Sequence, residues 1–247
     1  MKKVAMTAAV ALLGLCGSAF AGLAAPTGWD MVINFNGGTW RASNNPSTWT
    51  IGPVEKNGKT VWQVDGFFQS AHWSCDWTLE LDPDPFVFQN ILMTNLTAAP
   101  ATFSVTTTLP VFPTFPGPNT MDGSISGSII NQNNAPDVFG NGATVKSFGA
   151  LPFFEGIVDN VLVPTAQLRT APQLHTVPGF GTNAIPMESF AGLPAPANLV
   201  NIGIRNNFEL GNGDSVNFFS TFQIVPTPGG LALVVVGGIA AVRRRRA

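Results

Sequence analysis

The side chains that could carry out acid–base, thiol or metal chemistry are few in this sequence. Its two histidines, His72 and His175, are about a hundred residues apart, and neither has a zinc-binding spacing such as H-E-x-x-H. No G-x-S-x-G nucleophile turn or phosphate-binding glycine loop is present. Glu80 and Glu155 could form the carboxylate pair of a glycoside hydrolase, on residue type alone. A hydrolase therefore stays an alternative without a recognisable catalytic set, and we expect no enzymatic activity.

Two aspartates flank a proline in the stretch Asp82-Pro83-Asp84-Pro85. Both carboxylates could point at one hard cation, so the spacing suggests a weak calcium site at Asp82 and Asp84. The other interpretation is turn formation, because aspartate favours turns and proline ends strands. We expect no other cofactor.

All six tryptophans lie in the first third of the chain, where exposed indoles could stack on the faces of sugar rings. Four of them fall on strand faces that we assign to the core: Trp49, Trp62, Trp73 and Trp77. Trp29 and Trp40 remain as weak candidates for carbohydrate binding, with core packing as the alternative. Cys75 lies between two of these tryptophans and is expected to be a small buried hydrophobic residue.

Alternating apolar and polar residues between turn signals predict an all-β fold. The clearest strand covers residues 73–81, with every second residue apolar. Before it, Asn57-Gly58 predicts a two-residue hairpin turn that pairs Ile51 with Val64 and Pro53 with Trp62. Trp49, Ile51, Trp62 and Val64 would then share the face toward the core.

Further strands are predicted along the rest of the chain, at residues 86–94, 102–109, 121–130, 143–148, 156–163, 199–208 and 215–224. In the last of these, Phe219 is an exception to the alternation. Residues 164–196 are interrupted by prolines, which predicts a long loop over one end of the domain or a poorly ordered segment. Together the patterns predict one antiparallel β-sandwich or jelly-roll-like domain over residues 22–224.

The N-terminal 21 residues have the pattern of a signal peptide. Lys2 and Lys3 precede an apolar run, and Ala19-Phe20-Ala21 forms an A-x-A cleavage site that would leave Gly22 as the mature N-terminus. A buried N-terminal helix is one alternative. A lipoprotein signal at Cys16 is another, but bulky Leu15 stands where such a signal needs a small residue.

The C-terminal residues have a second targeting pattern. Val225-Pro226-Thr227-Pro228 precedes an uncharged segment, 229–242, and Arg243, Arg244, Arg245 and Arg246 follow it. As a helix this segment would reach about 21 Å at roughly 1.5 Å per residue, against a hydrocarbon core of about 30 Å. The arginines act as a stop-transfer signal and are expected to stay cytoplasmic, so that the preceding domain faces outward.

This tail resembles that of the PEP-CTERM proteins, the substrates of exosortases. The resemblance covers residues 225–247: a proline-containing motif, a short hydrophobic helix and a terminal arginine cluster, with Thr227 where the family has glutamate. It implies export, sorting at the membrane by an exosortase-like enzyme, and release or attachment at the cell surface. It implies nothing about the activity of the domain.

Removal of both targeting segments would leave an acidic domain. Six basic residues would remain against all fourteen acidic ones, a net charge of about −8, which disfavours binding to nucleic acid. With Cys16 removed, Cys75 alone is left, so no internal disulfide can form. We expect a structural or adhesive component of the cell surface or extracellular matrix. The alternative is a carbohydrate-binding surface module with exopolysaccharide as its partner. If Asp82 and Asp84 bind calcium, the ion would stabilise this module.

Overall fold

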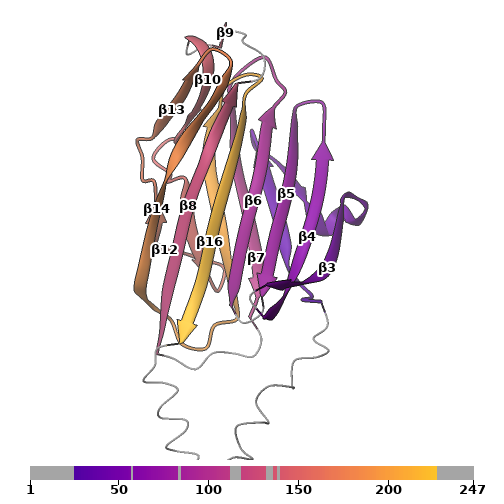
Figure 1. Cartoon of the computed structure of the whole chain (residues 1–247), viewed down its shortest axis with the longest axis vertical. Helices are drawn as coiled ribbons and strands as arrows, with labels where there is room; N and C mark the ends of the chain where they lie inside the picture. The colour runs from indigo at the N-terminus through magenta and orange to yellow at the C-terminus, as the bar shows by residue number, and fades with distance from the viewer. Residues whose placement is uncertain are drawn as a thin grey trace, which may run out of the picture.

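The fold is an all-β sandwich in which buried and partly exposed side chains alternate along the long strands. The computed structural model describes residues 25–226, except 57, 83–84, 112–117, 132–135 and 138–139. Two antiparallel sheets pack face to face (Figure 1), as the sequence predicts. Within these described ranges no helix has the length and apolar character needed to cross a bilayer.

The targeting segments fall outside the described residues. The expectations for the signal peptide, including Ala19, Ala21 and Gly22, and for the tail from Thr227 onward, including Pro228 and the arginine cluster, therefore stay predictions. Asp84 also lies outside the described part.

The seven-stranded sheet faces the viewer in Figure 1 and has the order β14-β8-β16-β6-β5-β4-β3 among the described residues. Its strands are β3 (Trp49–Lys56), β4 (Lys59–Gln69), β5 (Trp73–Asp82), β6 (Phe86–Asn95), β8 (Asn119–Asn131), β14 (Gly181–Ala195) and β16 (Ser215–Pro226).

The nine-stranded sheet lies behind it and follows the order β12-β11-β15-β7-β1-β2, with β10 joining β15, β13 and β9 in the described part of the chain. Its strands are β1 (Asp30–Phe35), β2 (Gly38–Arg41), β7 (Ala101–Pro110), β9 (Pro136–Asp137), β10 (Gly140–Lys146), β11 (Phe154–Val158), β12 (Val161–Leu168), β13 (Leu174–Pro178) and β15 (Asn201–Leu210). Two 3-10 turns, η1 (Ala42–Asn44) and η2 (Pro46–Thr48), connect β2 to β3.

The predicted hairpin between β3 and β4 is confirmed in its register. Ile51 pairs with Val64, and Pro53 pairs with Trp62. Gly58 has a φ of +74°, as a tight turn requires. Val64 is fully buried, and Trp49, Ile51 and Trp62 pack against the core from partly buried positions.

Large aromatic side chains fill the space between the sheets, with Trp77, Phe103, Phe208, Phe218 and Phe222 fully buried. Gly66 lies opposite Trp77 in the β4–β5 ladder. A Cβ added at Gly66 would lie within 2.3 Å of Trp77 ring atoms, so the indole occupies the place of the missing side chain. Cys75 is fully buried beside this ring system, as predicted, and burial raises the pKa of its thiol.

The prediction of a loop over residues 164–196 is wrong. The segment forms the end of β12, then β13 and the fifteen-residue strand β14. Proline lacks an N–H donor but is tolerated in edge strands and at bulges. β12 and β14 are the edge strands of their sheets, and the β14–β8 register shifts twice, near Pro186 and before Pro194.

Residues 156–163 form a hairpin instead of the single predicted strand. Asp159 and Asn160 have φ values of 52° and 64°, and Val158 pairs with Val161 across this two-residue turn. Both residue types tolerate the left-handed region, which type I′ turns require. β1 and β2, for which no strand was predicted, form a similar hairpin around Asn36-Gly37.

The last strand continues further than predicted. β16 reaches Pro226, which pairs with Asn119, so the domain extends two residues past the expected boundary at Ile224. The strand ends at the lower end of the sandwich in Figure 1.

Candidate functional site

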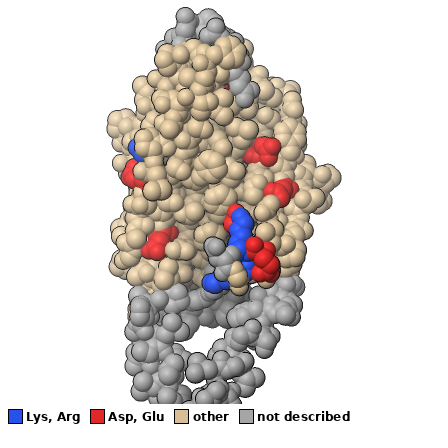
Figure 2. Space-filling view, in the orientation of Figure 1, with Lys and Arg blue, Asp and Glu red and all other residues tan. Residues whose placement is uncertain are grey.

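The outer face of the seven-stranded sheet is uncharged at mid-strand on β8, β16 and β6, whereas β5 beside them directs Asp76 and Glu80 outward. Figure 2 views this face and shows acidic atoms toward both sides and a cluster of basic and acidic atoms in its lower part, with an uncharged area between them. The adjacent strands β8, β16 and β6 direct alternate residues outward. Those at mid-strand are Ser124, Ser126 and Ser128 on β8, Asn217, Phe219 and Thr221 on β16, and Phe88, Asn90 and Leu92 on β6.

Phe219 is the exposed aromatic residue at the middle of this face. It is 39% exposed and lies near the middle of β16, the strand next to the central strand β6. In the ladders it is opposite Asn90 on one side and Ser126 on the other. Phe88 and Leu92 occupy the two diagonal positions on β6, about 7–8 Å away between Cα atoms, which aromatic and long side chains can bridge. Phe219 is therefore part of an apolar strip.

The two asparagines beside Phe219 have unused hydrogen-bonding capacity. The Oδ1 atoms of Asn90 and Asn217 are covered by neighbouring atoms and accept no hydrogen bond from the described residues. An unsatisfied carbonyl of this kind costs about 1–3 kcal/mol. A ligand hydroxyl could supply the missing donor after a rotation of the carboxamide. We call Phe88, Asn90, Leu92, Asn217 and Phe219 the Phe219 patch.

Hydroxyl groups next to the Phe219 patch are already paired with one another. Ser124 and Thr221 share a hydrogen bond of 2.7 Å between β8 and β16, and Thr94 and Ser215 share one of 2.8 Å between β6 and β16. These bonds hold the neutral face in one arrangement.

The two tryptophans proposed from sequence as sugar platforms pack against other aromatic side chains. Trp29 is buried, and its ring meets Trp49 edge-on at 4.9 Å between centroids. Trp40 is partly buried and packs against Phe68, Trp73 and Trp77. The structure thus places neither indole as a flat exposed platform.

Of the two aspartates suggested as calcium ligands, Asp82 alone is described. It ends β5 on the outer face and pairs with Phe86 in the ladder. No group of three or more histidine, cysteine, aspartate or glutamate side chains lies close enough to hold a metal ion within the described residues.

Glu80 and Glu155 do not form a carboxylate pair. Glu80 faces outward from β5 of the seven-stranded sheet and forms an ion pair with Lys56. Glu155 lies on the outer side of β11 in the other sheet, across the core. The sheets alone are about 10 Å apart, so carboxylates on their opposite outer faces exceed the roughly 5–9.5 Å separation of glycosidase pairs.

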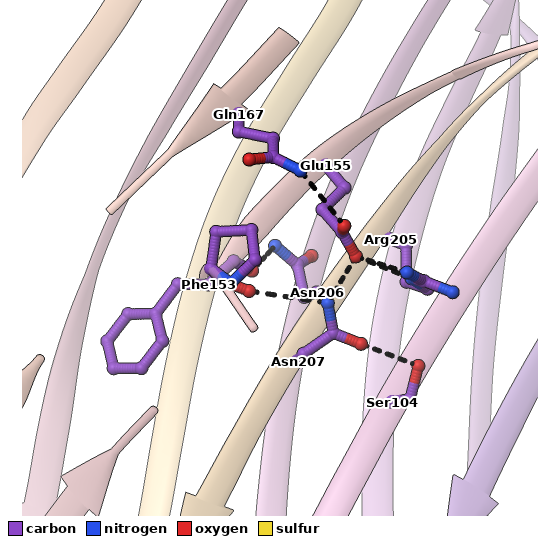
Figure 3. Close-up of polar contacts among 8 residues, drawn as sticks. Ser104, Phe153, Glu155, Gln167, Arg205, Asn206 and Asn207 are labelled. Carbon is purple, nitrogen blue, oxygen red and sulfur yellow. Dashed lines mark hydrogen bonds and ion pairs between the residues drawn. The ribbon is translucent and has the colours of Figure 1, made fainter. Parts of the chain in front are cut away.

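Glu155 is at the centre of a buried polar network (Figure 3). Its Oε2 accepts hydrogen bonds of 2.7 Å from Arg205 Nε and from Asn207 Nδ2, and its Oε1 accepts one of 3.4 Å from Gln167 Nε2. Ser104 Oγ donates to Asn207 Oδ1 over 2.9 Å. Both carboxylate oxygens are therefore occupied, and the network joins strands β7, β15, β11 and β12.

The histidines are in separate places. His72 stacks on Phe35, with 6.1 Å between ring centroids, whereas His175 on β13 packs near Phe153. Burial, and secondarily the charge of Arg169, lowers the pKa of His175. Among the described residues, neither histidine side chain forms a hydrogen bond to a carboxylate that would make it a general base.

Comparisons with known proteins give little beyond the fold. No protein-family model matches the sequence, and no curated protein matches it. Among solved structures, the chain is similar to a carbohydrate-binding module, TmCBM61, in complex with β-1,4-galactotriose. The TM-score is 0.23 at 7% identity, over 63% of this chain and 88% of that one. A similarity of this size does not transfer a binding site.

The sequence contained a signal for the Phe219 patch. Phe219 breaks the apolar–polar alternation of β16, and a large apolar residue on the outward phase of a strand indicates a surface aromatic. The signal for Phe67, 53% exposed on β4, was the pair Phe67-Phe68. Adjacent residues of a strand face opposite sides, so one of these two had to point outward.

Proposed function

We propose that this chain is an exported surface protein whose β-sandwich binds a polysaccharide through the outer face of its seven-stranded sheet. The observation that carries the proposal is the position of Phe219: an exposed aromatic ring near the middle of a sheet face, among the uncharged carboxamide and hydroxyl groups of β6, β16 and β8. Binding sites commonly combine an apolar contact area with a few placed polar groups.

The arrangement suits sugars for two reasons. An aromatic ring can cover the apolar face of a pyranose, and the amides of Asn90 and Asn217 offer donors and acceptors to its hydroxyls. The strands of a sheet also present these groups over an extended surface, which suits a chain better than a single small molecule.

The targeting part of the proposal rests on the sequence. The signal peptide at residues 1–21 and the PEP-CTERM-like tail at 225–247 support export and exosortase-like processing at the cell surface. We also propose that the connections between the strands of this domain resemble those of a jelly roll. A structural or adhesive role follows if the bound polysaccharide is part of the extracellular matrix.

The test is binding of the purified domain, residues 22–226, to a panel of neutral polysaccharides by affinity electrophoresis and calorimetry. We expect binding to at least one of them. Phe219→Ala should weaken it by up to about tenfold, because an aromatic contact contributes about 0.5–1.5 kcal/mol beyond its buried area.

Phe180→Ala is the matched control. Phe180 is 69% exposed but lies between β13 and β14, outside the Phe219 patch, so its removal should leave binding unchanged. If no polysaccharide binds, or if Phe219→Ala binds as tightly as the wild type, the proposal is wrong. A structural component without a glycan ligand would then be the better description.

A further inference from the structure

A second exposed aromatic residue lies on the same sheet face as Phe219, three strands away. Phe67 projects from β4 and is 53% exposed. The ladders connect the two sites: Phe219 is opposite Asn90, Asn90 is opposite Thr78, and Thr78 is opposite Asp65. Thr78 Oγ1 donates to Asp65 Oδ1 over 2.8 Å, so these side chains share the outer face.

The path between the two rings has the length of an oligosaccharide of several sugar units. Three strand spacings and one two-residue step along β4 separate Phe67 from Phe219, about 16 Å in all. Between them lie the uncharged side chains of Asn90, Leu92 and Thr78, together with Asp76, the direct partner of Phe67. We call this path, from Phe219 to Phe67, the cross-strand band.

Two carboxylates flank Phe67 at the far end of the cross-strand band. Asp76 is its direct partner in the β4–β5 ladder, and Asp65 is two residues away on β4. Asp65 accepts hydrogen bonds from the neutral side chains of Gln63 and Thr78. The Asp76 carboxylate is exposed and has no ion pair or side-chain hydrogen bond with a residue that the structure describes.

Among the residues that the structure describes, no basic side chain forms an ion pair with Asp65 or Asp76. Figure 2 shows acidic but no basic atoms over the upper right part of the face, where β5 and β4 run. Lys59 is eight residues from Phe67 along β4, about 26 Å away, and Lys56 pairs with Glu80. The Phe67 end therefore repels anionic sugars and favours a cation, which the face of Phe67 can also attract.

We infer that the polysaccharide carries positively charged amino sugars and lies along the cross-strand band. A neutral part of the chain stacks on Phe219, and an ammonium group lies at Phe67 between Asp65 and Asp76. This inference rests on the proposed function. It adds that the ligand is positively charged and that it lies across the strands of the sheet. A uronic-acid polysaccharide is disfavoured, because its carboxylates would face those of Asp65 and Asp76.

The test compares two oligosaccharides of one backbone, a β-1,4-glucosamine hexamer and its fully N-acetylated form. The full-length protein in mild detergent is titrated with each at mildly acidic pH. We expect the cationic hexamer to bind about two- to fivefold more tightly, with the difference decreasing as salt is raised. Asp76→Asn should reduce this preference, because it removes one of the two carboxylates beside Phe67.

Glu55→Gln is the control, since it removes the same charge from β3, outside the cross-strand band. Equal affinity of the wild type for both hexamers, or a preference that is undiminished in Asp76→Asn, overturns the amino-sugar inference. The proposed function has its own criterion, the loss of polysaccharide binding in Phe219→Ala. Binding that depends on Phe219 but ignores charge would contradict the inference alone, and absence of any binding would contradict both.

Discussion

The guanidinium of Arg205 on β15 donates to the buried carboxylate of Glu155 on the neighbouring strand β11, with 2.7 Å between Nε and Oε2. The two side chains differ in exposure: that of Glu155 is 3% exposed and that of Arg205 is 25% exposed. This difference makes the two ends of the ion pair unequal, because the arginine can turn toward water and the glutamate cannot.

Arg205→Ala should therefore destabilise the domain more than Glu155→Gln. Loss of the arginine leaves a charge buried with neutral donors only, and breaking a buried pair in this way costs about 3–5 kcal/mol. The glutamine variant leaves a cation that can reach solvent. Urea denaturation of residues 22–226 measures both.

The exposed pair between Arg41 and Asp30 is the comparison for this prediction. Arg41→Ala should cost less than about 1 kcal/mol, as surface pairs do. The double variant Arg205→Ala/Glu155→Gln should recover part of the stability lost in Arg205→Ala. Equal losses in Arg205→Ala and Arg41→Ala would mean that the network does not hold β11 to β15.

Gly66→Ala should overpack the core, because the Trp77 indole lies where the new methyl group would be placed. Insertion of a methyl group into a well-packed core costs about 1–3 kcal/mol. Gly52→Ala, on the neighbouring strand β3, is the control, since nothing lies within 4 Å of its added Cβ. Thermal unfolding followed by tryptophan fluorescence compares them, and a lower melting temperature is expected for Gly66→Ala alone.

Strands buried on one face could be predicted from the sequence, whereas the edge strand β14 could not. The strand β5 alternates strictly and β16 does so except at Phe219, because one side chain in two must enter the core. β14 has neighbours on one side only, and its pattern is interrupted by two bulges and by Pro186 and Pro194. Its exposed positions are not constrained to be polar or apolar, and so the alternation is lost.

The position of the candidate site could not be predicted from the sequence. The sequence indicated carbohydrate binding through tryptophans, but tryptophan counts do not show which rings are covered. Trp29 and Trp40 pack against residues up to about forty positions away in sequence, such as Trp49 and Trp77. The pairing of Phe67 with Asp76 and of Phe219 with Asn90 depends on strand order and register, which local alternation does not specify.

The stability of the domain should fall as the pH drops below about 6.5, in part because of His175. Burial lowers the pKa of this residue in the folded state below its ordinary value of 6.5, and Arg169 adds to the effect. The unfolded chain then binds the proton more readily, so that protonation favours unfolding. Above this pH the histidine is neutral in both states and contributes no slope.

His175→Gln should make the melting temperature less dependent on pH between about 7 and 5. Arg169→Ala should do so less strongly, because burial is the larger cause. Differential scanning calorimetry across this pH range measures the slopes. An unchanged slope in His175→Gln would mean that other groups set the acid sensitivity.

The sorting motif proposed for the tail begins inside the folded domain. Val225 pairs with Thr120 and Pro226 with Asn119, and Thr120 Oγ1 donates to the carbonyl oxygen of Val225. In the sequence only Thr227 and Pro228 separate this strand from the apolar segment 229–242. A processing enzyme at the membrane would therefore meet a motif of which half is held in the sheet.

Cleavage should accordingly fall after Pro226, since bonds before it are protected by the β16–β8 ladder. Insertion of a short glycine–serine spacer between Pro226 and Thr227 should increase the processed fraction, because flexible chain is the preferred substrate for proteolysis. Intact mass analysis of the protein extracted from cells measures the position and extent of cleavage.

Replacement of Arg243 to Arg246 with serine is the comparison: without stop-transfer charges, the chain should enter the medium with its tail attached. A wild-type chain that runs uncut to Ala247, with or without the spacer, would show that the tail is a permanent anchor and that no exosortase-like enzyme processes it.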